Sequence, residues 1–423
     1  QWDLQSCIDY AKEQNITIRK NRITAASTQI DVKTAKAALF PSLSFSTSQQ
    51  VVNRPYQETS SRVSGSEIIS SNSKTSYNGN YGLNASWTLY NGNKRLKTIQ
   101  QEKLNNQVAE LDVATSENNI QESIAQVYIQ ILYAAESVKV NESTLQVSIA
   151  QRDRGQELLN AGSIAKSDFA QLEAQVSTDR YQLVTAQATL EDYKLQLKQL
   201  LELDGENEMN IYLPALSDEN VLAPLPTKKD VYISALSLRP EIEASKLNVE
   251  ASELGIGIAK SSYLPTISLS AGIGTNHTSG SDFTFGEQVK NGWNNSIGLS
   301  VSVPIFNNRQ TKSAVQKAKL QYETSMLSLL DEQKTLYKTI EGLWLDANSA
   351  QQRYAAANEK LKSTQISYEL ISEQFNLGMK NTIELLTEKN NLLQAQQEQL
   401  QAKYMAILNT QLLKFYQGDQ LAI

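Results

Sequence analysis

The stretch from Asn295 to Phe306 reads NSIGLSVSVPIF and alternates between apolar and small polar residues. Apolar side chains occupy every second position from Ile297 to Val303, with serine or glycine between them. A period of two is typical of a β-strand with one apolar face and one wet face. The stretch has about the 9–11 residues that a tilted membrane-crossing strand needs. A similar stretch, NYGLNASWTLY, lies 216 positions upstream, so we expect a duplicated membrane β-element on a helical body.

The rest of the chain is also duplicated. Residues 34–46 (TAKAALFPSLSFS) align with 258–270 (IAKSSYLPTISLS) at an offset of 224, and from Gly82 onward the offset is 216. The difference of 8 falls between the two strands of each pair, as expected of a loop insertion. The first repeat, 1–213, is predicted to contain an opening helix at 3–38, strands at about 43–52 and 81–90, a long helix at 94–160 and a return helix at 165–203. The second repeat, 228–423, is predicted to contain an opening helix at 228–262, strands at about 267–275 and 296–305, a long helix at 308–376 and a return helix at 380–416. A connector at 214–227 joins the two repeats. The polar residues at 53–78 and 275–294 are interpreted as solvated turns.

The longest predicted helix, 94–160, contains no proline and a single interior glycine, Gly155. Apolar residues recur every seven positions at Ile124, Ile131, Val138 and Leu145, which is coiled-coil spacing. Its 67 residues would extend about 100 Å. The opening and return helices together have a similar length, so they can stack end to end beside it. The narrow apolar seam with polar flanks favours helices arranged in a wall with water on both sides.

Bulk composition excludes several classes of protein. The net charge of −6 over 423 residues gives little support for nucleic-acid binding. The chain has no run of about 18 apolar residues, so a membrane crossing would need a closed barrel of strands, because open strand edges are not satisfied in lipid. One cysteine and one histidine cannot supply an internal disulfide or a His/Cys metal cluster. We therefore expect no cofactor, no metal and no catalytic site.

The chain begins with Gln1-Trp2, which we interpret as a mature form whose export signal has been removed. Residues 4–7 (LQSC) resemble a lipoprotein cleavage box, which would make Cys7 a lipid anchor. Cys7 also starts a helical pattern with Ile8 and Ala11. A small residue within a helix is the preferred interpretation.

The duplicated order of helix, strand, strand, helix and helix resembles the TolC-like outer-membrane efflux channels. The Phe40-Pro41 and Leu264-Pro265 pairs before strands are similar to that family, as are the segments 160–174 (NAGSIAKSDFAQLEA) and 376–390 (NLGMKNTIELLTEKN). The resemblance implies a mainly α fold in which long hairpins of a homotrimer form an α-barrel and four strands per chain share one transmembrane β-barrel. Strand counting agrees with a trimer. The four strands of one chain cannot close a barrel, the eight strands of two chains would close one whose interior is filled by side chains, and the twelve strands of three chains would leave room for a pore.

The resemblance also implies a function. The protein would be the passive exit duct of a tripartite efflux pump or type I secretion system, in the bacterial outer membrane and extending into the periplasm. Its partners would be a periplasmic adaptor (membrane fusion) protein, an inner-membrane pump and outer-membrane lipid, with no nucleic acid. The alternative is a soluble periplasmic coiled-coil adaptor or scaffold, which the four alternating strands disfavour.

Two glycines, Gly162 and Gly378, follow helix ends and are expected to be left-handed helix caps. By resemblance, these turns are also hairpin tips that contact the adaptor, together with Ser163, Ile164 and Met379.

The resemblance further implies a periplasmic entrance gate of Asp168, Phe375, Lys380 and Glu384. The chain departs from the family pattern, since Phe375 is not a hydroxylated ring, Lys380 is not arginine, and Thr387 occupies a position for another acid. The alternative role for the two acids is an ordinary interaction with the helix dipole.

Aromatic residues cluster near the ends of the predicted strands, and we interpret them as a belt at the membrane interface, with ordinary core packing as the alternative. They are Phe40, Trp87, Tyr90, Tyr263, Trp293 and Phe306. The single histidine, His277, lies in a polar segment and is expected to be solvated.

Overall fold

The computed structural model describes residues 2–56, 60–64, 67–71, 74–204, 209–214, 221–281 and 283–422. Part of the predicted connector, residues 215–220, therefore lies outside the described residues. The chain divides into two compact units. Unit 1 comprises Gln1–Ala25, Val108–Ser245 and Ser328–Ile423, and unit 2 comprises Ala26–Gln107 and Lys246–Leu327. Each unit is assembled from both sequence repeats.

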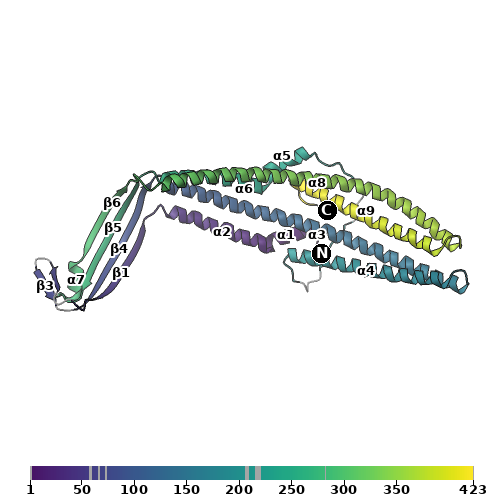
Figure 1. The fold of residues 1–423 in the computed structure, drawn as a ribbon, viewed down its shortest axis with the longest axis horizontal. Helices are drawn as coiled ribbons and strands as arrows, with labels where there is room; N and C mark the ends of the chain where they lie inside the picture. The colour runs from purple at the N-terminus through teal and green to yellow at the C-terminus, as the bar shows by residue number, and fades with distance from the viewer. Residues whose placement is uncertain are drawn as a thin grey trace. The chain divides into compact units, whose positions relative to one another are not determined.

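Unit 2 contains a four-stranded antiparallel sheet with the order β1-β4-β5-β6 (Figure 1). The strands are β1 (Ser42–Asn53), β4 (Thr75–Asn91), β5 (Thr266–Thr278) and β6 (Asn294–Ser302). The central pair, β4 and β5, joins the two sequence repeats. Because each repeat supplies two neighbouring strands, the duplication is built into the hydrogen bonding of the sheet.

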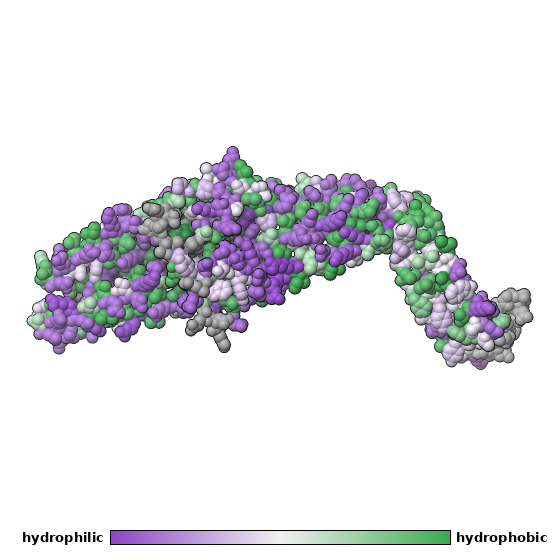
Figure 2. Space-filling model, turned by 180° about the vertical axis from the view of Figure 1, so that it is seen from behind, coloured by the Kyte–Doolittle hydropathy of each residue, from purple (hydrophilic) through white to green (hydrophobic). Residues whose placement is uncertain are grey.

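The register of the sheet separates apolar from polar side chains. Phe45, Leu83 and Ile273 are cross-strand partners on one face, and the partners Ser44, Asn84 and Gly272 lie on the other. Asn84 donates a hydrogen bond to Ser46 on the polar face, at 3.4 Å. The apolar face is uncovered, since Phe45 is 68% exposed. Apolar surface is gathered where the strands meet the helices of unit 2 (Figure 2). Uncovered apolar area of this kind marks a surface that contacts lipid or another protein.

None of the helices within the described residues combines the length and apolarity that crossing a bilayer requires.

The polar segments predicted as solvated turns contain ordered elements, so that prediction was partly wrong. Residues Ser60–Ser64 (β2) pair with Glu67–Ser71 (β3), and Phe285–Asn291 forms helix α7. In addition, β4 begins at Thr75 rather than near residue 81. Strand ladders are made by backbone groups, so serine- and asparagine-rich sequence can still pair. The helix has a sequence signal that we did not use: Thr284 and Glu287 form a capping box.

Unit 1 contains most of two long helical hairpins (Figure 1). Helix α3 (Lys94–Asn160), which enters the unit at Val108, leads into α4 (Lys166–Leu200), and α8 (Gln310–Asn376), which enters it at Ser328, leads into α9 (Thr382–Gln417). The heptad positions Ile124 and Ile131 on α3 are 0% and 1% exposed. The apolar seam read from the sequence is therefore the core of this part of the molecule.

Both opening helices are broken, whereas we predicted each as continuous. The first divides at Asn15 into α1 (Leu4–Gln14) and α2 (Ile16–Ala37), and the second divides into α5 (Lys228–Leu238) and α6 (Pro240–Ser261). The Asn15 side chain caps α2 by accepting from Thr17 N at 2.9 Å and donates to Leu200 O at 3.1 Å. At the second break Pro240 is the first residue of α6, where a missing N–H costs nothing.

Cys7 lies in α1 and is fully buried in the core of unit 1. Burial raises the pKa of its thiol to about 12. The interpretation of Cys7 as a small helix residue is confirmed.

A buried charge anchors the break between α5 and α6. Arg239 is 6% exposed and pairs with Glu122 at 2.9 Å and Glu241 at 2.8 Å. Its guanidinium carbon lies 4.0 Å from the ring centroid of Tyr416. Desolvation raises the pKa of Glu122, and the nearby Arg239 opposes that rise. Arg239 thus holds the break against α3 and α9.

A second buried ion pair joins the two hairpins. Lys389 on α9 donates to Asp179 on α4 and to Ser148 on α3, and the Lys389 and Asp179 side chains are 3% and 2% exposed. Gln175 Nε2 donates to the second oxygen of Asp179 at 2.9 Å. Desolvation lowers the pKa of Lys389, while its contact with Asp179 opposes that shift. Sequence patterns did not reveal this cluster, because a lysine and an aspartate on long helices look solvated.

Replacing Lys389 with methionine would leave the Asp179 carboxylate buried without its counter-ion. We expect destabilisation of about 3–5 kcal/mol, seen as a lower melting temperature of the detergent-solubilised protein. The matched control is Lys360→Met, which removes the exposed pair with Glu398 at 2.7 Å and should cost about 0–1 kcal/mol. The double variant Lys389→Met with Asp179→Leu should recover much of the loss. Equal melting temperatures for Lys389→Met and Lys360→Met would show that the buried pair has no special weight.

Candidate functional site: hairpin tips and the exposed sheet face

Both hairpin tips are closed by the same glycine turn. Gly162 and Gly378 have φ of 74° and 75°, which is the left-handed region. At the first tip, Ser163 N donates to Leu158 O at 2.8 Å and Gly162 N donates to Leu159 O at 2.9 Å. The second tip repeats this pair of hydrogen bonds. Such bonding is the Schellman motif, and it confirms the expected helix-cap role of both glycines.

The two tips differ in surface chemistry. The first exposes Gly162 and Ser163, with Ile164 half-buried. The second exposes three apolar side chains, Leu377 at 70%, Met379 at 71% and Ile383 at 61%. We had singled out Met379 but missed Leu377 and Ile383. An available signal was the presence of large apolar residues on both sides of a tip glycine, where the chain has little to pack against.

The predicted gate residues lie in the last turn of α8 and around the N-termini of α4 and α9. Asp168 accepts from Ala165 N at 3.3 Å, and Glu384 accepts from Asn381 N at 3.2 Å. Both acids therefore sit where the helix dipole favours them. Phe375 is only 4% exposed. The role of these residues in an entrance stays a prediction.

Lys380 pairs with Glu384 on its own hairpin, with 2.6 Å between Nζ and Oε1. The hydrogen bond from Lys380 is the main cause that lowers the pKa of Glu384. Ties between the two hairpins are made instead by the Lys389 cluster and by Gln151, which donates to the Tyr368 hydroxyl at 2.9 Å.

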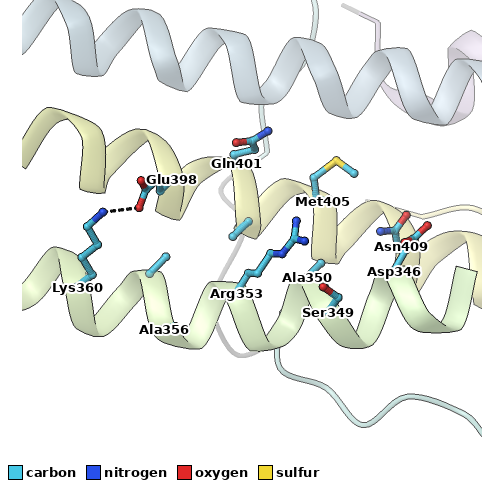
Figure 3. Close-up of a pocket in the computed structure, with 12 residues that line it drawn as sticks. Asp346, Ser349, Ala350, Arg353, Ala356, Lys360, Glu398, Gln401, Met405 and Asn409 are labelled. Atoms are coloured by element: carbon cyan, nitrogen blue, oxygen red, sulfur yellow. Dashed lines mark hydrogen bonds and ion pairs between the residues drawn. The ribbon is translucent and has the colours of Figure 1, made fainter.

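A groove of about 550 Å³ runs between α8 and α9 (Figure 3). Small side chains, including Ala350, Ala356 and Ala402, open it, and Arg353 extends into it (Figure 3). The Lys360–Glu398 pair lies along it, at 2.7 Å. A groove lined by alanines between two helices can accept the side chains of another helix.

Five of the six predicted belt residues lie where the strands meet the helices. Phe40 is 73% exposed, Tyr263 52% and Phe306 83%. Trp87 is 39% exposed, and its indole N–H donates to Leu39 O at 2.8 Å. Tyr90 is half-buried. This exposure is contrary to core packing for Phe40 and Phe306.

Trp293 lies at the opposite end of the sheet and is 57% exposed. Exposed aromatics that we missed are at the same end: Tyr77 at 56%, Phe283 at 43% and Phe285 at 58%. His277, expected to be solvated, is instead stacked on Tyr81 at 5.8 Å and meets the edge of Phe285 at 5.1 Å. We missed this group because we interpreted 275–294 as a turn.

Among the described residues, no group of three or more His, Cys, Asp and Glu side chains is arranged to hold a metal ion.

Comparison with known proteins extends over both repeats. The family model described as "Outer membrane efflux protein" matches residues 7–202 and 231–418. Outer membrane efflux protein BepC of Brucella suis is 24% identical over 294 residues, which is 69% of this chain and 61% of BepC. Outer membrane protein TolC of Escherichia coli K12 is 23% identical over 311 residues, 71% of this chain and 62% of TolC. These alignments thus span about three-fifths of each of these two relatives.

The fold is shared with a solved structure. CusC, whose crystal structures are described as showing transmembrane channel formation, superposes with a TM-score of 0.83 at 19% identity. The superposition covers 99% of this chain and 92% of CusC. The duplicated helix–strand plan, the family match and this likeness agree, and they confirm the resemblance seen in the sequence. The chain belongs to the outer membrane efflux protein family, and it is an outer-membrane protein that extends into the periplasm.

Proposed function

We propose that the protein is a passive exit duct in the outer membrane, serving an efflux pump or a type I secretion system. One observation carries the proposal: among the residues that the structure describes, most of the apolar face of the sheet is uncovered, and β1 and β6 are each paired on one side only. In lipid, every backbone N–H and C=O must be satisfied, so such edges must meet other strands. The name of BepC as an efflux protein supports export as the function.

The sheet geometry supports closure by copies of the same chain. Its four strands are antiparallel throughout, so β6 of one copy runs opposite to β1 of the next and can pair with it. Two copies would give eight strands, whose interior side chains fill, whereas three would give twelve strands and a pore. We therefore propose a homotrimer. The groove between α8 and α9 would then receive a helix of the neighbouring copy.

The polar face of the sheet would line the duct and the apolar face would contact lipid. The aromatic residues at both ends of the strands would lie at the two membrane interfaces. The apolar side chains of the second tip, Leu377, Met379 and Ile383, would dock a helical hairpin of a periplasmic adaptor. Energy would come from an inner-membrane pump, because a duct performs no chemistry. A soluble coiled-coil adaptor is a poorer explanation, since it would leave the apolar sheet face in water.

The trimeric duct can be tested on the purified protein. Native mass spectrometry in mild detergent should give three times the chain mass of 47.0 kDa, and the same sample should conduct ions in a planar bilayer. A stable monomer or dimer without conductance would contradict both the trimer and the duct.

The two faces of β6 should differ in their tolerance of charge. Leu299→Arg would put a guanidinium into lipid at a cost of about 2–4 kcal/mol if it lies near the midplane. Ser300→Arg, the adjacent position on the other face, would point into water and should be tolerated. The measurement is the fraction of protein assembled as trimer after refolding in detergent. Equal assembly of the two variants would reverse or remove the proposed inside and outside of the sheet.

We also propose that Asp168, Phe375, Lys380 and Glu384 restrict the periplasmic entrance of the trimer. Lys380→Glu would replace a neutralised pair by adjacent negative charges near the tip, and three copies would repel one another. We expect a higher single-channel conductance with unchanged assembly. Lys139→Glu is the control, because it likewise puts a glutamate beside the partner acid of an exposed pair, Glu136, but on α3 and farther from the tips. If Lys380→Glu conducts like the parent, Asp168 and Glu384 are only helix-end acids.

A further inference from the structure

Helix α7, Phe285–Asn291, is fastened to β5 at the end of the sheet away from the helices (Figure 1). The Thr275 hydroxyl donates to Val289 O at 2.6 Å, and Gln288 Oε1 accepts from Thr278 N at 2.8 Å. The Phe285 ring meets His277 at 5.1 Å. The helix is therefore held in place from both of its turns.

The register shows which face of the sheet α7 covers. Thr275 and His277 follow Ile273 at steps of two along β5, so they share the apolar face. His277 lies over Gly79, where an added Cβ would be 2.1 Å from its Cε1 atom. The glycine thus lets the imidazole lie close to the strand and beneath Phe285. Helix α7 therefore continues the apolar face and stays off the serine-rich face.

The segment exposes aromatic side chains next to polar ones. Phe283, Phe285 and Trp293 are 43%, 58% and 57% exposed. Glu287 and Lys290 are exposed on the helix between them. Large aromatics beside charged groups, at the edge of an apolar surface, fit the boundary between acyl chains and headgroups, where one part of the side chain is apolar and the surroundings are wet.

We propose that α7, with Phe283 and Trp293 on either side of it, is an interfacial helix that binds the outer leaflet of the membrane. The aromatic rings contact the acyl–headgroup boundary, and Glu287 and Lys290 face the headgroups and water. This occupant follows from continuity, because the helix extends the same face that contacts lipid in the proposed duct. The inference rests on that proposed function, and it adds a lipid contact made by a segment between two strands.

Spin-label accessibility in vesicles can test this placement. Single cysteines at Phe285→Cys, Trp293→Cys and the matched control Lys290→Cys would carry a nitroxide in protein reconstituted into phosphatidylcholine–phosphatidylglycerol vesicles. The parent protein is the labelling blank, since the Cys7 thiol is buried and its pKa is raised to about 12. The ratio of collisions with oxygen, which concentrates in lipid, to collisions with a water-soluble nickel chelate should be several-fold higher at 285 and 293 than at 290.

A fourth label, Leu299→Cys, reports on the middle of the sheet and separates two kinds of failure. If 299 is lipid-exposed but 285 and 293 are open to the nickel chelate, α7 stands in water and this inference is wrong while the duct survives. If 285 and 293 are shielded from both reagents, α7 packs against protein and the inference is again wrong. If the label at 299 is itself open to the nickel chelate, the apolar face of the sheet does not contact lipid. Both the proposed duct and the lipid contact of α7 are then wrong.

Discussion

Open strand edges are the constraint on which the rest of the structure depends. Within the described residues, the sheet presents unpaired backbone groups along β1 and β6, and its apolar face has no covering layer apart from α7 at one end. In the proposed duct, lipid would cover the apolar face but could not hydrogen-bond the edges, so pairing between copies would have to satisfy them. An even number of antiparallel strands makes that pairing possible without any change of direction. The duplication supplies this even number, because each repeat adds one strand pair.

The helices satisfy a different constraint, since in the proposed duct they would stay packed with water on both sides. A narrow heptad seam provides a core on α3 without a broad apolar face, and Ile124 and Ile131 are buried in it. Long helices of this kind gain little from burial at their tips. The Schellman turns at Gly162 and Gly378 complete the backbone hydrogen bonding there, and the buried Lys389–Asp179 pair joins the hairpins nearby. The apolar core, the Schellman turns and the buried ion pair thus stabilise different positions along the length of the same hairpins.

Periodicity allowed the sequence to predict the strands and long helices, including the bounds 94–160 of α3. It failed where a single side chain or a contact far along the chain decides the structure. Asn15 breaks the first helix by capping the next one, and the aromatic group around α7 needed a fold to bring Tyr81 and Phe285 against His277. Lys389 and Asp179 are 210 positions apart on different helices. No local pattern distinguishes them from solvated charges, so pattern reasoning found the tips but not what joins them.

The two repeats have diverged where their hairpins meet. The proposed trimer therefore has two different kinds of contact between hairpins, one within a chain and one between neighbouring copies. At the offset of 216, Lys389 corresponds to Glu173 and Asp179 corresponds to Ala395. A glutamate and an alanine cannot form an ion pair, so the equivalent positions of the opposite repeats do not supply a second copy of the buried pair. Within a chain, α4 and α9 are joined by this pair, and removing either partner would strand a buried charge. A seam between copies would bring α4 of one chain against a different surface of the next and would lack the pair. Any widening of the entrance should therefore begin between copies, and the two hairpins of one chain should move together.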